Sequence, residues 1–200
     1  LQLFAGPTPI AANDDWRVAA NAADVQASGF APSNDREGAI LATLAPGAYT
    51  AIVSGVAGTT GVGLVEVFEV DLPASPLVNI ATRGRVLTGN DVMIAGFVIQ
   101  GDLPQKVVIR ARGPSLAAQG VPGVLANPVL QVFSGATPVA VNDDWGLAAN
   151  AAALQASGFA PADPREAAVL VTLEPGAYTA IVTGAGSTTG VGIVEVFAIP

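Results

Sequence analysis

Short apolar runs separated by clusters of turn residues dominate the first third of the chain. The runs are rich in Val, Ile, Leu, Tyr and Phe, and clusters such as AGPTP, LAPG and SGVAGTTG lie between them. Runs of this kind, bounded by Gly and Pro, predict β-strands. The expected strands are LQLF, IAAN, AILATL, AYTAIVSG and VGLVEVFEV, at residues 1–4, 10–13, 39–44, 48–55 and 62–70.

One stretch carries helical signals instead. Residues 16–28 are rich in Ala, Asp15 precedes them as a favourable N-cap, and Gly29 follows them as a favourable residue for ending a helix. We therefore expect a short helix over 16–28. The same signals recur at Asp144 and Gly158, which predicts a second helix of the same kind.

The signals recur because the chain contains an internal repeat. Residues 1–71 align without gaps with residues 130–200, and most aligned positions are identical. The segment between the two copies has no counterpart elsewhere in the chain. Its runs LVNIATRGRV, VMIAGFVIQG and KVVIRAR predict further strands, and a Gly/Pro-rich connection leads from them into the second copy.

The unrepeated segment and the second copy together hold about eight strands, a normal number for an antiparallel sandwich. We therefore predict an all-β protein made of one and a half antiparallel β-sandwich modules, each with a short Ala-rich helix. The complete module spans 73–200, with strands over 77–112 and the repeat copy at 130–200. Residues 1–72 form an incomplete half.

The distribution of charge predicts that the unrepeated segment packs against the repeat. The chain has a net charge of −8, both copies of the repeat are acidic, and residues 73–129 are basic. Alternation along VGLVEVFEV places Glu66 on the same face as Leu64 and Phe68, and Glu195 stands likewise in the second copy. A carboxylate on an apolar face needs a cation or hydrogen bonds. The expected partners are the arginine pairs of the unrepeated segment, namely Arg83 with Arg85 and Arg110 with Arg112. The alternative is that this face is open to solvent and the glutamate only marks it.

The chain therefore has two acidic copies of the repeat but only one basic segment that could cover them. The first copy therefore needs covering strands that come from another chain or from further residues of a longer protein. Alternatively, it packs against the same segment from the other side. Strand addition between unlike surfaces is heterologous, and it propagates into a fibre when its rotation does not close.

The run from NDVMIAGFVIQGDLPQKVVIRAR through VLQVFSGATPVAVNDDW to LEPGAYTAIVTGAGSTTGVGIVEVF resembles the bacterial pre-peptidase C-terminal module. The resemblance covers residues 90–200 and, for the rear part of the module, residues 1–70. The Ala-rich helix departs from the family pattern. The resemblance implies a jelly-roll-like β-sandwich of secreted bacterial proteins, generally without catalytic activity. The combination NDDW, GFAP, REAAVL and LEPGAYTAIV also resembles repeats of large bacterial surface proteins, so we expect an extracellular or cell-surface location.

Composition argues against most catalytic chemistry. The chain has no His and no Cys, which removes the commonest general base, the Ser–His–Asp triad and thiolate metal sites. Its acidic balance argues against nucleic acid as a partner. No apolar run is long enough to predict a membrane span. We expect a protein that is not an enzyme and has no cofactor.

The sequence Asn-Asp-Asp-Trp occurs in both copies and offers two other kinds of site. Its carboxylates could ligate Ca²⁺, although the spacing of a calcium loop is lacking; the alternative is an Asx-turn that caps the helix. The candidate ligands are Asp14, Asp15, Asp143 and Asp144. Trp16 and Trp145 could stack on a glycan or anchor the core.

Together these features predict a non-catalytic extracellular structural protein. We expect it to form a homo-oligomer or homopolymer, as a fibre or surface layer, in which a neighbouring chain completes the incomplete half. One alternative is an accessory module that attaches a secreted protein or a cell to polysaccharide, with or without Ca²⁺. Another is a spacer module of a tandem-repeat surface protein.

Overall fold

The computed structural model describes residues 1–70 and 76–199 and divides the chain into two compact units. Unit 1 is Leu1–Pro76 and unit 2 is Leu77–Pro200. The predicted module boundary between residues 72 and 73 lies outside the described residues. None of the helices in the described part of the chain is long and apolar enough to cross a membrane.

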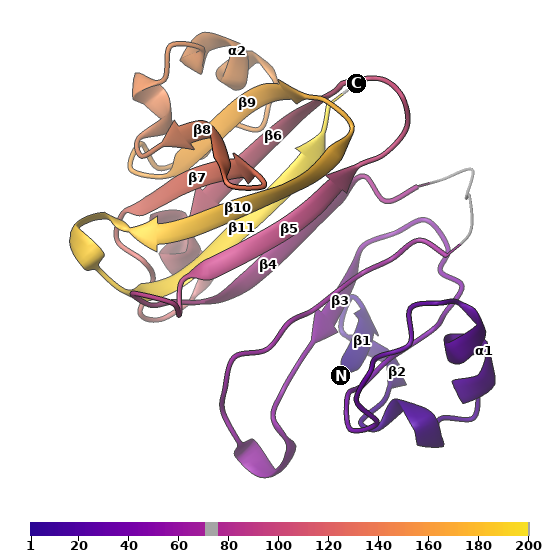
Figure 1. The fold of residues 1–200 in the computed structure, drawn as a ribbon. Coiled ribbons are helices and arrows are strands. Elements are labelled where there is room, and N and C mark those ends of the chain that lie inside the picture. Colours follow the sequence, from indigo (N-terminus) through magenta and orange to yellow (C-terminus); the bar gives the residue numbers. More distant parts are fainter. Residues whose placement is uncertain (71–75, 200) are drawn as a thin grey trace. The chain divides into compact units, whose positions relative to one another are not determined.

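The described residues of unit 2 form two four-stranded antiparallel sheets, one in the order β5-β10-β7-β8 and the other β4-β11-β6-β9 (Figure 1). Their strands are β4 (Asn79–Val86), β5 (Met93–Ile99), β6 (Gln105–Arg112), β7 (Pro128–Ser134), β8 (Thr137–Asn142), β9 (Ala167–Leu173), β10 (Gly176–Gly184) and β11 (Gly190–Ala198). Short 3₁₀ turns are η3 (Pro114–Gln119) and η5 (Ala185–Ser187). The predicted all-β, sandwich-like fold is confirmed.

Side chains from both sheets meet in one core. Because strand side chains alternate between faces, Val194 and Val196 of β11 enter this core, while Glu195 and Phe197 lie on the outer face of their sheet. The core also takes in Val107, Ile109 and Ala111 from β6, Leu130 and Val132 from β7, Val169 and Leu173 from β9, and Tyr178, Ala180 and Val182 from β10.

The connection between β8 and β9 covers the outer face of the β4-β11-β6-β9 sheet. It contains a 3₁₀ turn, η4 (Trp145–Leu147), and helix α2 (Ala151–Ala156). Leu154 of α2 packs with Val108 and Leu170 of the sheet, and Phe159 and Phe197 join this second cluster. The outer face of this sheet is therefore partly buried as well.

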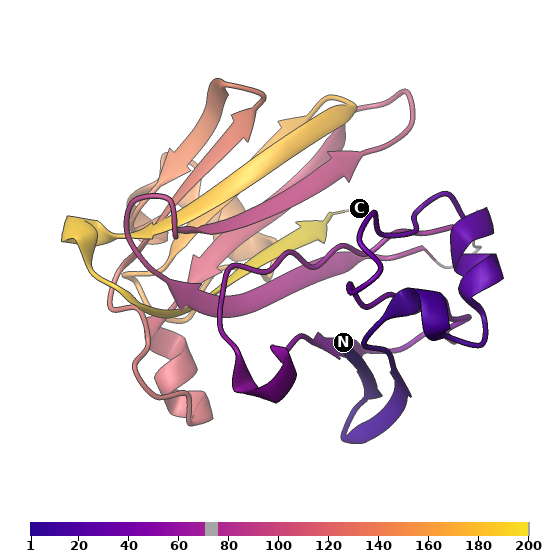
Figure 2. The ribbon, with the colours of Figure 1, turned by 60° about the horizontal axis from the view of Figure 1, so that its bottom comes forward.

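Unit 1 has the same local elements in its first half. Its described residues hold one three-stranded antiparallel sheet in the order β2-β1-β3, seen in Figure 2. The elements are β1 (Gln2–Ala5), β2 (Thr8–Ala12), η1 (Trp16–Val18), α1 (Ala22–Ala27), β3 (Tyr49–Ile52) and η2 (Val56–Gly58).

The helix expected over 16–28 is interrupted. Ala19 takes an extended conformation with φ −64° and ψ 146°, which separates η1 from α1. Asp15 precedes η1 but makes no side-chain capping hydrogen bond, and Asn21 precedes α1. Gly29 has φ +82°, the left-handed conformation that a residue ending a helix needs. The expected helix end is therefore right and its single continuous body is wrong.

Two expected strands of unit 1, at 39–44 and 62–70, are not strands in the structure. Their counterparts in unit 2 are β9 and β11, and both pair there with β6 of the unrepeated segment. The described residues of unit 1 include no counterpart of β6 to lie between them. The prediction was wrong because an apolar, β-branched sequence becomes a strand only where a neighbour pairs with its backbone.

Candidate interaction surface

Unit 2 shows how the unrepeated segment completes the repeat. Strand β6 lies between β9 and β11, with Lys106 opposite Thr172 on one side and Arg110 opposite Glu195 on the other. Strand β4 pairs with the other side of β11, and β5 pairs with β10. The segment thus supplies one central strand and two edge strands to sheets whose other strands come from the repeat (Figure 1). We call residues 77–115 the covering segment.

Glu195 is held by two arginines of the covering segment. Its side chain lies on β11 and the residue is only 6% exposed. Arg110 Nε and Arg112 Nε lie 2.6 and 2.7 Å from Glu195 Oε2, and the Nη2 atom of each arginine lies 3.2 Å from Oε1. Both guanidinium groups therefore bind the carboxylate through two hydrogen bonds, the strongest geometry for such a pair.

Arg110 makes two further contacts that fix its guanidinium. Its Nη1 donates to the carbonyl oxygen of Phe159 at 2.9 Å, and its Cζ lies 4.8 Å from the ring centroid of Phe197. Phe159 and Phe197 are themselves in contact, with ring centroids 4.6 Å apart. A carboxylate, a carbonyl oxygen and an aromatic face thus form one guanidinium site.

Burial alone would raise the pKa of Glu195. The hydrogen bonds and positive charges of Arg110 and Arg112 outweigh it and hold this pKa below its ordinary value. The ionised carboxylate is therefore the form that the folded unit prefers.

The lowered pKa predicts a pH dependence for unit 2. A carboxyl group whose pKa is depressed on folding contributes stability above its unfolded pKa, about 4.3, and loses it as pH falls through the folded value. We expect the free energy of unfolding of wild-type chain to fall more steeply below about pH 4 than that of Glu195→Gln. Urea unfolding followed from pH 7 to pH 3 measures this, and parallel curves for the two proteins would contradict it.

A second carboxylate of the same interface, Glu166, was not among the residues predicted from the sequence. This residue is fully buried, and it accepts hydrogen bonds from Gly113 N at 3.0 Å, Ser115 N at 2.9 Å and Ser115 Oγ at 2.6 Å. Arg112 Nη1 lies 3.2 Å from the same Ser115 Oγ, which links the two carboxylate sites. A Cβ atom at Gly113 would collide with the carbonyl of Leu125, so the turn needs glycine there. The available signal was that Arg and Glu alone persist where Asp35-Arg36-Glu37 aligns with Pro164-Arg165-Glu166.

Unit 1 keeps the internal hydrogen bonds of the repeat. Asn13 Oδ1 accepts from Ala39 N at 2.9 Å, and Asn142 Oδ1 accepts from Ala168 N at the same distance. The Nδ2 group of each asparagine donates to the backbone of the second aspartate in its Asn-Asp-Asp sequence. The Phe30 and Phe68 rings are also in contact, stacked with centroids 4.3 Å apart, and their counterparts Phe159 and Phe197 form a tilted pair with centroids 4.6 Å apart. These local contacts within the repeat therefore recur in both units, although two of its strands form only in unit 2.

The difference between the units lies in exposure. Val65 and Val67 are 42% and 51% exposed, whereas their counterparts Val194 and Val196 are 1% and 9% exposed. The same holds for other residues of unit 1 whose counterparts pair with the covering segment. We call the set the acceptor face: Leu44, Val53, Val65, Glu66, Val67 and Phe68.

Glu66 and Glu37, the counterparts of Glu195 and Glu166, lack the partners seen in unit 2 among the described residues. Glu66 is exposed, and no salt bridge to it occurs among the described residues. Glu37, the counterpart of Glu166, is exposed and accepts only a long 3.4 Å hydrogen bond from Asn34 N within that part of the chain. Arg17 of unit 1 forms an ion pair with Asp35.

The structure places the other arginine pair away from Glu195. Arg83 and Arg85 are exposed on the edge strand β4, opposite Ile193 and Val191, whereas Ala81 lies opposite Glu195. The β4 register, rather than the charge pattern, decides this.

The Asn-Asp-Asp-Trp sequences lie at the start of η1 and η4. Asp14, Asp15 and Asp143 are exposed, Asp144 is half-buried, and within the described residues no group of three or more His, Cys, Asp or Glu side chains is placed to hold a metal ion. Burial and the charge of Asp144 raise the pKa of Asp143, against a hydrogen bond from the Asn127 amide. The calcium site stays a prediction.

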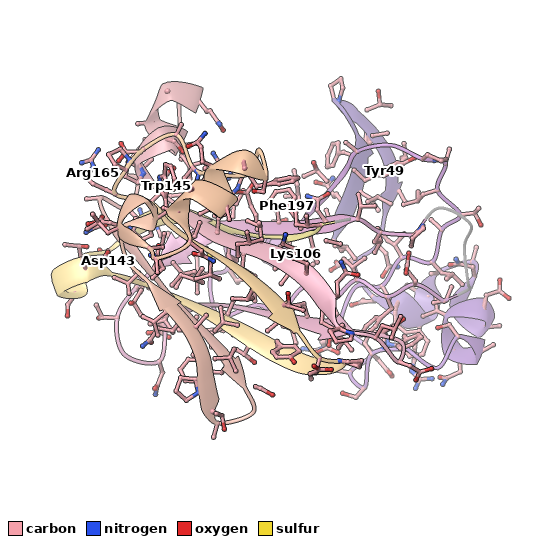
Figure 3. The ribbon with its side chains drawn as sticks, turned by 90° about the horizontal axis from the view of Figure 1, so that it is seen from above. Tyr49, Lys106, Asp143, Trp145, Arg165 and Phe197 are labelled. Carbon is pink, nitrogen blue, oxygen red and sulfur yellow. The ribbon has the colours of Figure 1, made fainter. Side chains whose placement is uncertain are left out.

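The two tryptophans differ in environment. Trp16 is buried, so its ring offers no face to a sugar. Trp145 is half-buried and its Nε1 donates to Asp163 O at 3.3 Å. Figure 3 shows Trp145 near Asp143 and Arg165, at the end of unit 2 that carries α2.

No family model and no curated protein matches the chain. Its structure is similar to the 1.0 Å crystal structure of the pre-peptidase C-terminal domain of collagenase from Bacillus anthracis, with a TM-score of 0.38 and 11% sequence identity. The similarity covers 60% of this chain and 89% of that chain. A likeness at this level says nothing about function.

Proposed function

We propose that the chain is a non-catalytic structural protein that works by assembly. The acceptor face of unit 1 takes up a segment of the same kind as residues 77–115 from a neighbouring chain, by strand addition. The observation that carries this proposal is the contrast between the units. One sequence, with the same internal hydrogen bonds, is covered in unit 2 and exposed in unit 1.

The ratio of surfaces determines the kind of assembly. Each chain has two repeat copies and one covering segment, so exchange between chains completes one acceptor face and frees another. The free face can then receive the segment of a third chain. Because one acceptor face stays open after each such heterologous contact, further chains can add, and the assembly grows into a fibre or a surface layer. We place this assembly outside a bacterial cell, on the resemblance of residues 90–200 to secreted modules.

A spacer in a tandem array is the second candidate, and the repeat itself favours it. Residue 129 leads directly into Leu130, the counterpart of Leu1. A copy of residues 77–129 in front of Leu1 would therefore complete unit 1 within one polypeptide. The two candidates share the interface and differ in whether the covering segment comes from another chain.

The mass of the purified 200-residue chain tests the assembly proposal. We expect the average mass to rise with concentration in sedimentation velocity or light scattering, because each covering segment that pairs with unit 1 of a neighbouring chain joins two chains. Exchange requires unit 2 to open, so the rise should develop over hours and accelerate in mild urea. A mass that stays that of a monomer over a hundredfold range of concentration, with and without urea, would contradict the proposal.

A further inference from the structure

We infer that the acceptor face selects its partner by sequence, binding a strand with the pattern Arg-x-Arg followed by Gly-x-Ser. This inference rests on the proposed function and names the partner of the same face. Glu66, Phe68 and the carbonyl of Phe30 receive the first arginine, and Glu37 receives the Gly-x-Ser turn.

The guanidinium site of unit 2 gives the template. Arg110 is held there by the carboxylate of Glu195, the ring of Phe197 and the carbonyl of Phe159. The alignment places Glu66, Phe68 and Phe30 at the corresponding positions of unit 1, without a substitution. All components of the site apart from the cation are therefore present in unit 1.

Part of this site is already assembled in unit 1. The Phe30 and Phe68 rings are stacked at 4.3 Å with 17° between their planes, so the aromatic face does not have to form on binding. Glu66 lies two residues before Phe68 and is exposed to solvent. The aromatic and anionic groups that would bind the guanidinium, Phe68 and Glu66, are therefore close together in the chain.

Glu37 provides the second contact. In unit 2 its counterpart accepts three hydrogen bonds from the turn that directly follows the paired arginines. Arg112 reaches both carboxylate sites, because it donates to Glu195 and to Ser115 Oγ. A partner must therefore present the arginines and the turn in one continuous stretch, as the sequence IRARGPS does at residues 109–115.

The two glutamates also reject other strands. A β-strand without arginine would cover Glu66 and leave its charge buried and unpaired, which is strongly unfavourable. An exposed apolar face alone would accept any hydrophobic strand. The carboxylates therefore supply specificity through the penalty that they impose on the wrong partner.

A labelled donor peptide of residues 77–119 tests this selection on the full-length chain by fluorescence anisotropy. We compare the native peptide with its Arg110→Met/Arg112→Met form and with Lys106→Met, which removes one charge outside the site. We expect the double substitution to weaken binding on the order of 100-fold and Lys106→Met to change it less than about threefold. In a chain carrying Glu66→Gln the difference between the native and doubly substituted peptides should shrink to about tenfold or less, whereas Asp24→Asn, a charge change on the exposed side of α1, should leave it intact.

The outcomes separate the inference from the function on which it rests. Equal binding of all three peptides would overturn the sequence selection and leave strand addition standing. If the chain with Glu66→Gln still distinguishes the native peptide from the doubly substituted one to the same extent, the inference is also overturned, because the arginines then bind to residues other than Glu66. Absence of binding by every peptide would overturn both.

Discussion

A chain lengthened by a second copy of residues 77–129 directly before Leu1 should fold into two complete sandwich modules and remain monomeric. In this protein residues 39–44 and 62–70 gain the neighbour that β9 and β11 have in unit 2. We expect both segments to become strands, and their backbone amides to become protected from hydrogen exchange to the level of β9 and β11.

The expected gain in stability follows from the acceptor face. Burying a Val or Leu side chain completely stabilises a protein by about 1.5–3 kcal/mol. Leu44, Val53, Val65 and Val67 are about half exposed, so their burial alone should stabilise unit 1 by roughly 3–6 kcal/mol. Exchange measured by mass spectrometry on the lengthened and original chains, beside a chain lengthened by a scrambled copy, gives the answer. Unchanged protection of 62–70 would show that unit 1 does not use a covering segment.

Residues 62–70 show how much of the fold could be predicted from the sequence. The alternation of apolar residues in this segment identifies the two faces correctly. In unit 2 the corresponding residues of β11 alternate between the core and the outer face of the sheet. The state of this segment in unit 1 could not be predicted, because strand formation depends on a partner that local sequence does not contain. Repeats show this with unusual clarity, since one sequence takes two states in one chain.

The candidate interaction surface, too, could be predicted from the sequence only in part. Alternation and charge are enough to single out Glu195 and to point to arginines of the unrepeated segment as its partners. They do not decide between Arg83 with Arg85 and Arg110 with Arg112, because that choice depends on strand register, and register is set by the whole sheet. The partners of Glu166 could not be predicted from charge, since a buried carboxylate that binds backbone N–H groups leaves no charge pattern in its partner.

The covering segment explains why the two units differ in charge environment as well as in exposure. In unit 2 it brings the guanidinium groups that neutralise Glu195 inside the sheet. In unit 1 the homologous carboxylates face water, where an ionised group needs no partner. The same glutamate is therefore harmless in one unit and dependent on arginine in the other, and this sets opposite expectations for its removal.

Glu195→Ala should unfold unit 2 far more readily than wild type, whereas Glu66→Ala should leave folding almost unchanged. Removing one partner of a buried ion pair typically costs about 3–5 kcal/mol, because the remaining charge is buried without compensation. In unit 2 two guanidinium groups would be left facing each other across the empty position. For Glu66, which is exposed, we expect a change within about 0.5 kcal/mol. Urea unfolding of the three proteins measures both effects.

On assembly the two substitutions should have the opposite ranking: Glu66→Ala should impair it, whereas Glu195→Ala should not. Glu66→Ala removes the carboxylate that receives the arginine of a neighbour, so its concentration-dependent rise in mass should be reduced or lost. Glu195→Ala destabilises the pairing of the covering segment with its own unit 2, which frees that segment for exchange and should increase assembly at moderate temperature. The pair is informative because the two glutamates align in the repeat and differ in whether a covering segment is present. Similar effects of both substitutions on folding and on mass would show that the two carboxylates have the same environment, and the assignment of unit 1 as an open acceptor would fail.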